Sequence, residues 1–287
     1  MGDSDGENLG DTSTLEHIRN LFYTTSTPSN DIIIFSDIMK HSHNTIIVTG
    51  GGSGIGRELA RRWQAVGNTV IVAGRNMEHL RETIEDSDTM YAYELDMTSE
   101  ESIEVFAKMI VEKHPETNVL VNNAGIMGFE NITARRDMRH AENVIDTNLL
   151  GPIRLINAFI DHLQSMKDAA IVNVSSGLAF VPFPISPTYS ASKAAIHSYT
   201  ESLRRQLEGK VEVIEIAPPG VRTDLNPGQS ENEEYMPLDA FIDEVMTLLQ
   251  QEPTPSEILV ERVKPLRFAE RDSKFDIILK NMPASLD

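Results

Sequence analysis

The chain has 287 residues, of which 44 are Asp or Glu and 25 are Lys or Arg, so its formal net charge is −19. This acidity argues against nucleic-acid and anionic-membrane partners, which bind through clustered basic side chains. Cysteine is absent, which excludes disulfides, thiolate metal sites and cysteine nucleophiles.

The N-terminal segment, residues 1–44, differs in composition from the rest of the chain. It holds seven acidic and two basic residues and is rich in Ser, Thr and Asn, so we expect an acidic, mostly flexible extension. Met39, just before the first convincing strand, is an alternative natural start. The segment lacks the pattern of a secretory signal, and no apolar run in the chain reaches the roughly 18 residues of a membrane helix, so we expect a cytoplasmic protein.

From residue 45 to 287, short apolar runs alternate with amphipathic stretches. The predicted strands are Thr45–Val48, Thr69–Ala73, Met90–Leu95, Val119–Val121, Ala170–Val174, Val211–Ile216 and Ile258–Val260. The predicted helices lie near residues 55–66, 77–86, 100–113, 138–166, 189–208 and 238–251. This alternation predicts a single α/β domain with a Rossmann-like, doubly wound sheet of about seven parallel strands and helices on both faces. Ligands of such sheets bind at the carboxyl ends of the strands.

A glycine-rich turn follows the first predicted strand. It reads Thr49-Gly50-Gly51-Gly52-Ser53-Gly54-Ile55-Gly56 and leads into a helix, a context in which backbone N–H groups and the helix dipole receive a pyrophosphate. The glycines at 50, 54 and 56 have a longer spacing than G-x-G-x-x-G. We predict cofactor contacts in this turn, and the alternative is a strand-to-helix loop with permissive glycines. The residues concerned are Gly50, Ser53, Gly54, Ile55 and Gly56.

The second predicted strand ends in Gly74 and Arg75. An acid at this point accepts the 2′-hydroxyl of a nucleotide ribose, whereas an Arg accommodates a 2′-phosphate. The sequence therefore favours NADP(H), with NAD(H) possible. The alternative is that Arg75 is a solvated surface residue.

Tyr189 and Lys193 are four residues apart in a predicted helix, so their side chains share one face. An ammonium beside a phenol stabilises the phenolate and lowers the pKa of the tyrosine, which otherwise lies near 10. We therefore expect Tyr189 to exchange a proton with a carbonyl or alcohol oxygen. Taken alone, such a pair is usually an exposed helix pair.

Two further motifs stand at strand ends: Asn122-Asn123-Ala124-Gly125, and Ser175-Ser176-Gly177 with Ser176 thirteen residues before Tyr189. Together with the glycine turn and the Tyr-Lys pair, they resemble the short-chain dehydrogenase/reductase family in its short single-domain form. The resemblance covers roughly residues 44–223. It implies homodimers or homotetramers and an NADP(H)-dependent enzyme that transfers hydride between the nicotinamide and a carbonyl or alcohol substrate.

The resemblance also implies a role for each matching residue. Tyr189 would be the general acid and base, Lys193 would bind the nicotinamide ribose, and Ser176, with Ser175 as the alternative, would hold the substrate oxygen. Asn148 would link Lys193 to a water relay. The other implied cofactor contacts are Asp96 and Met97 at the adenine, Asn123, Ala124 and Gly125 at the adenosine ribose, and Val221 and Thr223 at the carboxamide.

One segment departs from the family pattern Pro-Gly-x-Val-x-Thr. Here Pro219 takes the place of the glycine. Proline fixes φ near −65° and removes a hydrogen-bond donor from the loop over the nicotinamide. The variant resembles a bacterial subgroup of the family associated with D-alanine transfer genes.

The substrate is not readable from the motifs. An apolar, proline-rich stretch at residues 178–187 suggests a wall for a largely nonpolar carbonyl compound, although a rigid core loop explains it equally well. We expect no metal site, because the eight histidines are scattered. The main alternative function is an NADP(H)-sensing regulator without catalysis. An epimerase or dehydratase of the extended branch of the family fits the glycine spacing less well.

Overall fold

A seven-stranded parallel sheet is the framework of the computed structural model, which describes residues 39–285. The strand order is β3-β2-β1-β4-β5-β6-β7, and each neighbouring pair is parallel. The strands are β1 (Thr45–Thr49), β2 (Thr69–Gly74), β3 (Met90–Glu94), β4 (Thr117–Asn122), β5 (Ala170–Val174), β6 (Glu212–Ile216) and β7 (Glu257–Ile258). The predicted doubly wound sheet is confirmed, and its strand order reverses between β1 and β4.

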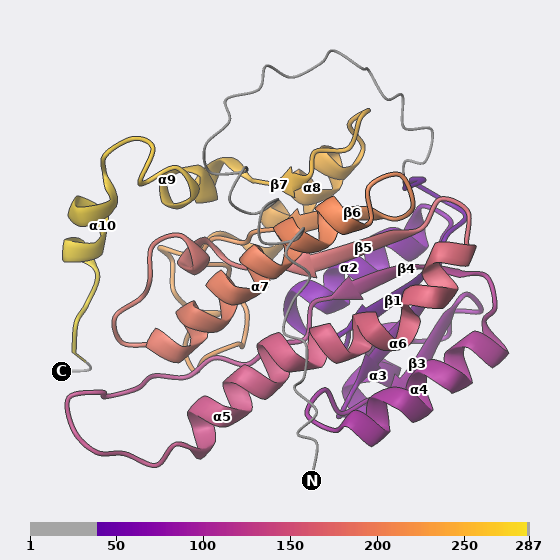
Figure 1. Cartoon of the computed structure of the whole chain (residues 1–287), viewed down its shortest axis with the longest axis horizontal. Helices are drawn as coiled ribbons and strands as arrows, with labels where there is room; N and C mark the ends of the chain where they lie inside the picture. The colour runs from indigo at the N-terminus through magenta and orange to yellow at the C-terminus, as the bar shows by residue number, and fades with distance from the viewer. Residues whose placement is uncertain (1–38, 286–287) are drawn as a thin grey trace, which may run out of the picture. The chain divides into compact units, whose positions relative to one another are not determined.

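Helices flank the sheet in the cartoon (Figure 1). An apolar core lies on each face of the sheet. Alternate side chains of each central strand enter opposite cores, so that Ile46 lies in one core and Ile47 in the other. The first core is closed by α2 (Gly54–Ala65), α3 (Met77–Ile84) and α8 (Leu238–Leu249). The second is closed by α4 (Glu100–Lys113), α6 (Gly151–Ser165) and α7 (Pro187–Gln206).

The helix predicted over 138–166 is interrupted in the structure. It divides into α5 (Arg139–Ile145), a π-helical turn at Asp146–Leu150, and α6. A Cβ at Gly151, the first residue of α6, would lie 2.7 Å from the carbonyl oxygen of Met97, so the chain passes very close to the segment that follows β3 at this point. The π turn carries Asn148, one of the predicted site residues.

Short helical segments complete the described chain. They are the 3-10 turns Gly177–Ala179 and Glu261–Val263 and the helices α9 (Lys264–Arg267) and α10 (Phe275–Asn281). The sequence did not predict them, because segments of three to seven residues are too short to establish a helical period.

Most of the predicted N-terminal extension, residues 1–38, lies outside the described residues, as do residues 286–287. Residues 39–44 contact the body of the domain. The backbone N–H of Met39 donates to the Glu212 carboxylate at 2.7 Å, and Lys40 lies 2.5 Å from Asp168. The boundary at residue 44 stays a prediction. Across residues 39–285 we find no helix with the length and hydropathy that a membrane span requires.

Candidate active site at the strand ends

Two adjoining cavities, of about 210 and about 380 Å³, lie at the carboxyl ends of the central strands. Both are lined by Gly50, Ser53, Ala124, Gly125 and Ile126, so they form one continuous groove. The structure brings together in this groove every predicted site residue except Asn148. Those residues are Gly50, Ser53, Gly54, Ile55, Gly56, Arg75, Asp96, Met97, Asn123, Ala124, Gly125, Ser176, Tyr189, Lys193, Val221 and Thr223.

The glycine turn is closed so tightly that two of its positions admit only glycine. Gly50 has a φ of +66°, and a Cβ there would lie 2.9 Å from the Cα of Ala124. A Cβ at Gly56 would lie 2.4 Å from the carbonyl oxygen of Gly50. Ser53, the N-cap of α2, is exposed and makes no side-chain capping bond. The first N–H groups of α2 and the Ser53 hydroxyl therefore face the groove as donors, which fits the pyrophosphate of a dinucleotide.

Thr49, a residue that the sequence analysis did not single out, joins the ends of β1 and β4. Its Oγ1 accepts the backbone N–H groups of Asn123 and Ala124, both at 3.0 Å. The Asn123 amide in turn donates to the carbonyl of Thr49 at 2.9 Å. These bonds fix the turn against the Asn-Asn-Ala-Gly segment at the point where the strand order reverses. The signal in the sequence that could have identified Thr49 was a threonine at the end of a buried strand.

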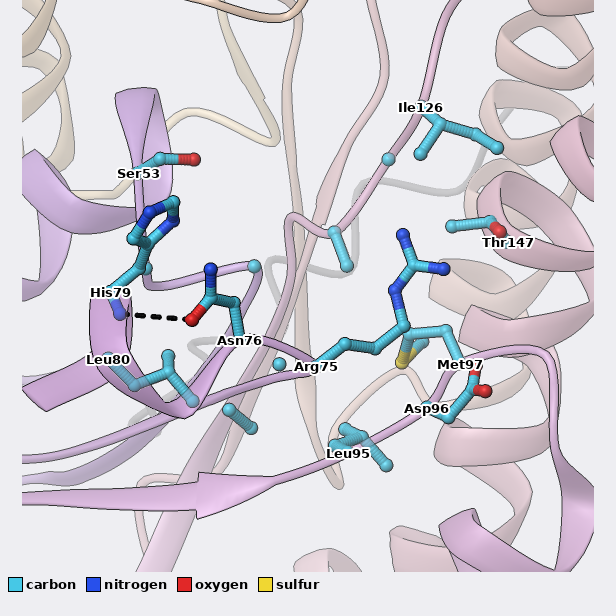
Figure 2. A pocket seen from close by; sticks show the side chains of 16 residues that line it. Ser53, Arg75, Asn76, His79, Leu80, Leu95, Asp96, Met97, Ile126 and Thr147 are labelled. Atoms are coloured by element: carbon cyan, nitrogen blue, oxygen red, sulfur yellow. Dashed lines mark hydrogen bonds between the residues drawn. The ribbon is translucent and has the colours of Figure 1, made fainter.

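The smaller cavity contains Arg75 and Asp96 (Figure 2). Figure 2 shows the Arg75 guanidinium pointing into the cavity toward Thr147, with Ser53 and His79 on the opposite side. Hydrogen bonds from Thr98 outweigh burial and lower the pKa of Asp96, and the charge of Arg75 adds to this effect. The Asp96 carboxylate is therefore charged and held beside a cation.

Asn76 and His79 also line the smaller cavity, and neither was predicted as a site residue. The side chain of Asn76 caps α3 by accepting the backbone N–H groups of Glu78 at 3.0 Å and His79 at 3.3 Å. This cap begins the helix at the rim of the cavity and so places His79 there. The signal in the sequence was an N-cap residue directly after Arg75.

The larger cavity contains Ser176, Tyr189 and Lys193, all of which are buried. Tyr189 and Lys193 lie in the first two turns of α7, and the Lys193 Nζ is 5.7 Å from the centroid of the Tyr189 ring. Lys193 donates to the carbonyl oxygen of Val174 at 2.8 Å. Ser176 follows β5, so an alcohol, a phenol and an amine from two elements meet at one place.

Burial dominates the protonation of this pair. It raises the pKa of Tyr189 to about 12, although a hydrogen bond with Ser176 opposes the shift. It lowers the pKa of Lys193 to about 8, and the charge of Glu215 opposes that shift. The expectation that Lys193 brings the pKa of Tyr189 below its ordinary value is therefore not met by the protein residues alone, because removing both groups from water favours their neutral forms.

Asn148 lies behind the groove wall and does not line it. Its side chain accepts the backbone N–H of Ile126 at 2.8 Å, donates to the carbonyl of the same residue at 2.9 Å, and donates to the Ser192 hydroxyl at 3.2 Å. Asn148 thus holds the segment after β4 against α7. A Cβ at Gly125 would lie 3.4 Å from its Oδ1 and 3.6 Å from the Nζ of Lys193, so Asn148 and Lys193 flank the same point of the wall.

The loop after β6 closes the far side of the larger cavity. The carbonyl of Pro218 accepts the N–H of Gly177 at 2.8 Å, and Pro219 lines the cavity. Gln229, which the sequence analysis did not identify, donates to the carbonyl of Val221 at 2.9 Å and to the hydroxyl of Thr223 at 3.1 Å. Gln229 therefore ties the segment that follows Thr223 to the two predicted carboxamide contacts, Val221 and Thr223.

The suggested apolar wall at residues 178–187 is wrong, because none of these residues lines either cavity. Within the stretch, Val181, Ile185 and Ser186 are buried, whereas Pro182 is exposed and the other residues are partly buried, so the alternative of a core loop holds only in part. The apolar lining of the substrate side comes instead from Ile126, Met127, Pro219 and Leu225, with Asp224 and Gln229 as polar members.

The family model of short chain dehydrogenases matches residues 44–234. The chain belongs to the short-chain dehydrogenase family. It is thus an oxidoreductase of that family, as its strand-end groove indicates. The uncharacterized oxidoreductase DltE of Bacillus subtilis is 37% identical over 258 residues, which cover 85% of this chain and 98% of that protein. This similarity confirms the subgroup predicted from Pro219.

Two other family members are similar over large parts of the chain. Sulfoacetaldehyde reductase 2 of Chromohalobacter salexigens is 32% identical over 193 residues, which cover 66% of this chain and 73% of that protein. The crystal structure of a short chain dehydrogenase from Burkholderia cenocepacia in complex with NADP has a TM-score of 0.73 and 24% identity, and the match covers 85% of this chain and all of that one. The second similarity supports the fold.

Proposed function

We propose that this chain is an NADP(H)-dependent reductase of aldehydes or related carbonyl compounds with a Ser-Tyr-Lys active site. The observation that carries the proposal is the meeting of Ser176, Tyr189 and Lys193 in a cavity continuous with the glycine turn. A nucleotide bound along this groove would have its phosphates at the N-terminus of α2 and its nicotinamide end in the larger cavity.

The chain's own residues supply substrate orientation and proton transfer. The hydroxyl groups of Ser176 and Tyr189 donate hydrogen bonds to the substrate oxygen, and Tyr189 gives that oxygen its proton as negative charge develops. The charged form of Lys193 stabilises the phenolate that remains. The nicotinamide, when bound, supplies the hydride. Burial of all three side chains excludes water and strengthens these interactions.

The preference for NADP(H) rests on the smaller cavity. Arg75 stands where a 2′-phosphate is bound in related nucleotide sheets, and no acid follows β2 to accept a 2′-hydroxyl. Ser53 and His79 add two further polar side chains to the same cavity. A phosphate with this surround receives charge-assisted hydrogen bonds from a guanidinium.

An aldehyde substrate agrees with the substrate side of the groove and with the relatives. The lining by Met127, Pro219 and Leu225 is apolar, whereas Gln229 and Asp224 are polar, so a small carbonyl compound with both kinds of surface fits. The Chromohalobacter relative is a sulfoacetaldehyde reductase, and an NADPH-dependent pterin aldehyde reductase of Arabidopsis thaliana is 30% identical over 184 residues.

The test is a screen of NADPH oxidation by the full chain against a panel of aldehydes, ketones and quinones. We expect turnover with at least one aldehyde, and slower turnover with NADH than with NADPH. Tight NADPH binding without oxidation by any compound would contradict the proposal and favour a nucleotide-sensing regulator.

A further inference from the structure

A buried carboxylate lies beneath the helix that carries Tyr189 and Lys193. Glu215, on β6, is fully buried and points to the face of the sheet that α7 covers, since it alternates with Ile214 and Ile216 of the other core. Its Oε2 is 2.8 Å from the Nδ1 of His197, which follows Lys193 by one turn of α7. Its Oε1 has no hydrogen-bond partner among residues 39–285.

Glu215 also lies next to the anchor of Lys193. Residues Asn173 and Glu215 are paired in the β5-β6 register, and the following residue of β5, Val174, accepts the hydrogen bond from the Lys193 ammonium. The charge of Glu215 acts on Lys193 and favours its protonated form. A buried carboxylate with one unpartnered oxygen costs folding free energy, so a purely structural explanation would predict a neutral residue at this position.

We propose that Glu215, held by the partly exposed His197, keeps Lys193 charged at neutral pH and so acts as a positioning residue for the Ser-Tyr-Lys site. The inference rests on the proposed function, because it assigns Glu215 a role through Lys193. His197 donates to Oε2, which stabilises the ionised carboxylate.

The other charged groups around Glu215 and His197 form salt bridges with one another. They are Glu201 and Arg204 on α7, Glu257 on β7 and Arg267 on α9. Arg204 pairs with Glu201, and Arg267 binds both oxygens of Glu257 at 2.6 and 3.0 Å. Glu215 is therefore the carboxylate that faces both His197 and Lys193.

The same cluster does not carry a metal site. His197, Glu201 and Glu215 bring potential ligand atoms within 4.8 Å of one another. Arg204 already uses the carboxylate of Glu201, and the charge of Arg267 acts on His197, so two guanidinium groups oppose a bound cation. An ion pair explains the geometry without a further charge.

The sign of the effect does not depend on which member of the Tyr189-Lys193 pair loses a proton first. A neighbouring negative charge disfavours a phenolate and favours an ammonium, so it raises the pH of either deprotonation. Glu215→Gln removes that charge with little change of shape and must lower this pH.

The direct test is an NMR titration of the full chain labelled with ¹³C at the lysine Cε, with the Lys193 signal assigned from its loss in Lys193→Arg. We expect the Lys193 midpoint to fall by about one pH unit in Glu215→Gln. Glu257→Gln, which removes a carboxylate from the same cluster, is the matched control and should leave the midpoint unchanged. Equal midpoints in the wild type and Glu215→Gln, or an equal shift in Glu257→Gln, would overturn the inference.

A kinetic measurement separates this inference from the proposed function. With an aldehyde that the chain reduces, the high-pH limb of the kcat profile should move to lower pH in Glu215→Gln and stay in place in Glu257→Gln. A shifted Lys193 titration in a chain that reduces no carbonyl compound would support the charge coupling and contradict the proposed function. Carbonyl reduction by the wild type together with an unshifted Lys193 titration in Glu215→Gln would support the proposed function and contradict the charge coupling.

Discussion

Burial is the main influence on the pKa values of the two titratable residues in the larger cavity. Tyr189 and Lys193 sit in the same cavity, yet desolvation moves the pKa of the first up and that of the second down. The sequence predicted the pair and its shared helix face from a four-residue spacing. It did not predict the direction of these shifts, because burial and the carboxylate of Glu215 come from other elements of the fold.

At the same scale, Arg75 is expected to decide between the two nicotinamide cofactors. Arg75→Ala removes a guanidinium that can form charge-assisted hydrogen bonds with a 2′-phosphate, a group that NADH lacks. We expect the KM for NADPH to rise about tenfold or more, and the KM for NADH to change little. Steady-state kinetics with both cofactors measure this.

Arg81→Ala is the control for Arg75, because Arg81 is an exposed arginine of α3 that lines neither cavity. It should leave both constants near their wild-type values. An equal rise for NADPH and NADH in Arg75→Ala would refute the assignment of the 2′-phosphate to Arg75.

Among the elements, the loop between β4 and α5 is attached to the start of α7. Glu130, which is buried, accepts the backbone N–H of Thr188 at 3.0 Å and its hydroxyl at 2.8 Å, and it pairs with Arg136 at 2.6 Å. Ser186 donates to the carbonyl of Gly128 at 2.7 Å. Because Thr188 precedes Tyr189, these contacts position the N-terminus of α7 relative to the groove.

Glu130→Ala should therefore destabilise the fold by about 2 kcal/mol, because it leaves buried donors without an acceptor. Burial raises the pKa of Glu130, but the bonds from Thr188 and the charge of Arg136 outweigh it and lower that pKa. A lowered pKa stabilises the folded state above the ordinary value of 4.5, and the gain is lost as pH falls through the folded value.

Thermal unfolding as a function of pH checks this sign. The difference in Tm between the wild type and Glu130→Ala should be full at neutral pH and shrink in acid below 4.5. Glu142→Ala, an exposed acid of α5, should show little difference at any pH. A difference for Glu130→Ala that stays constant into acid would show that its ionised carboxylate is not the stabilising group.

The elements also show how far sequence patterns reach. Apolar runs bounded by turns predicted all seven strands, because a parallel sheet with two covered faces needs continuous apolar segments. The 138–166 prediction missed the π turn at Asp146–Leu150, since one amphipathic period continues through it. For the stretch 178–187 the sequence left a substrate wall and a core loop equally open, because sequence shows apolar character but not which side of a loop faces a cavity; in the structure it lines neither cavity.

The whole molecule combines a net charge of −19 with a groove suited to an anionic cofactor. The groove can do this because its positive groups are local: the N-terminus of α2, Arg75 and Lys193. Strand-end motifs predicted the groove correctly, since doubly wound topology brings the ends of distant strands together. Other lining residues, such as His79 and Gln229, were not predicted, because their positions depend on where a helix begins and how a loop closes. The cytoplasmic location and the homo-oligomer stay predictions.

The central claim is that Tyr189 transfers the proton in a carbonyl reduction. Tyr189→Phe removes only the hydroxyl, and Tyr199→Phe makes the same change farther along α7, outside both cavities. The decisive measurement is the single-turnover rate of NADPH oxidation with an active aldehyde, together with NADPH affinity. We predict that Tyr189→Phe loses turnover by at least about a hundredfold while binding NADPH normally, and that Tyr199→Phe retains both. Unimpaired turnover in Tyr189→Phe would contradict the account.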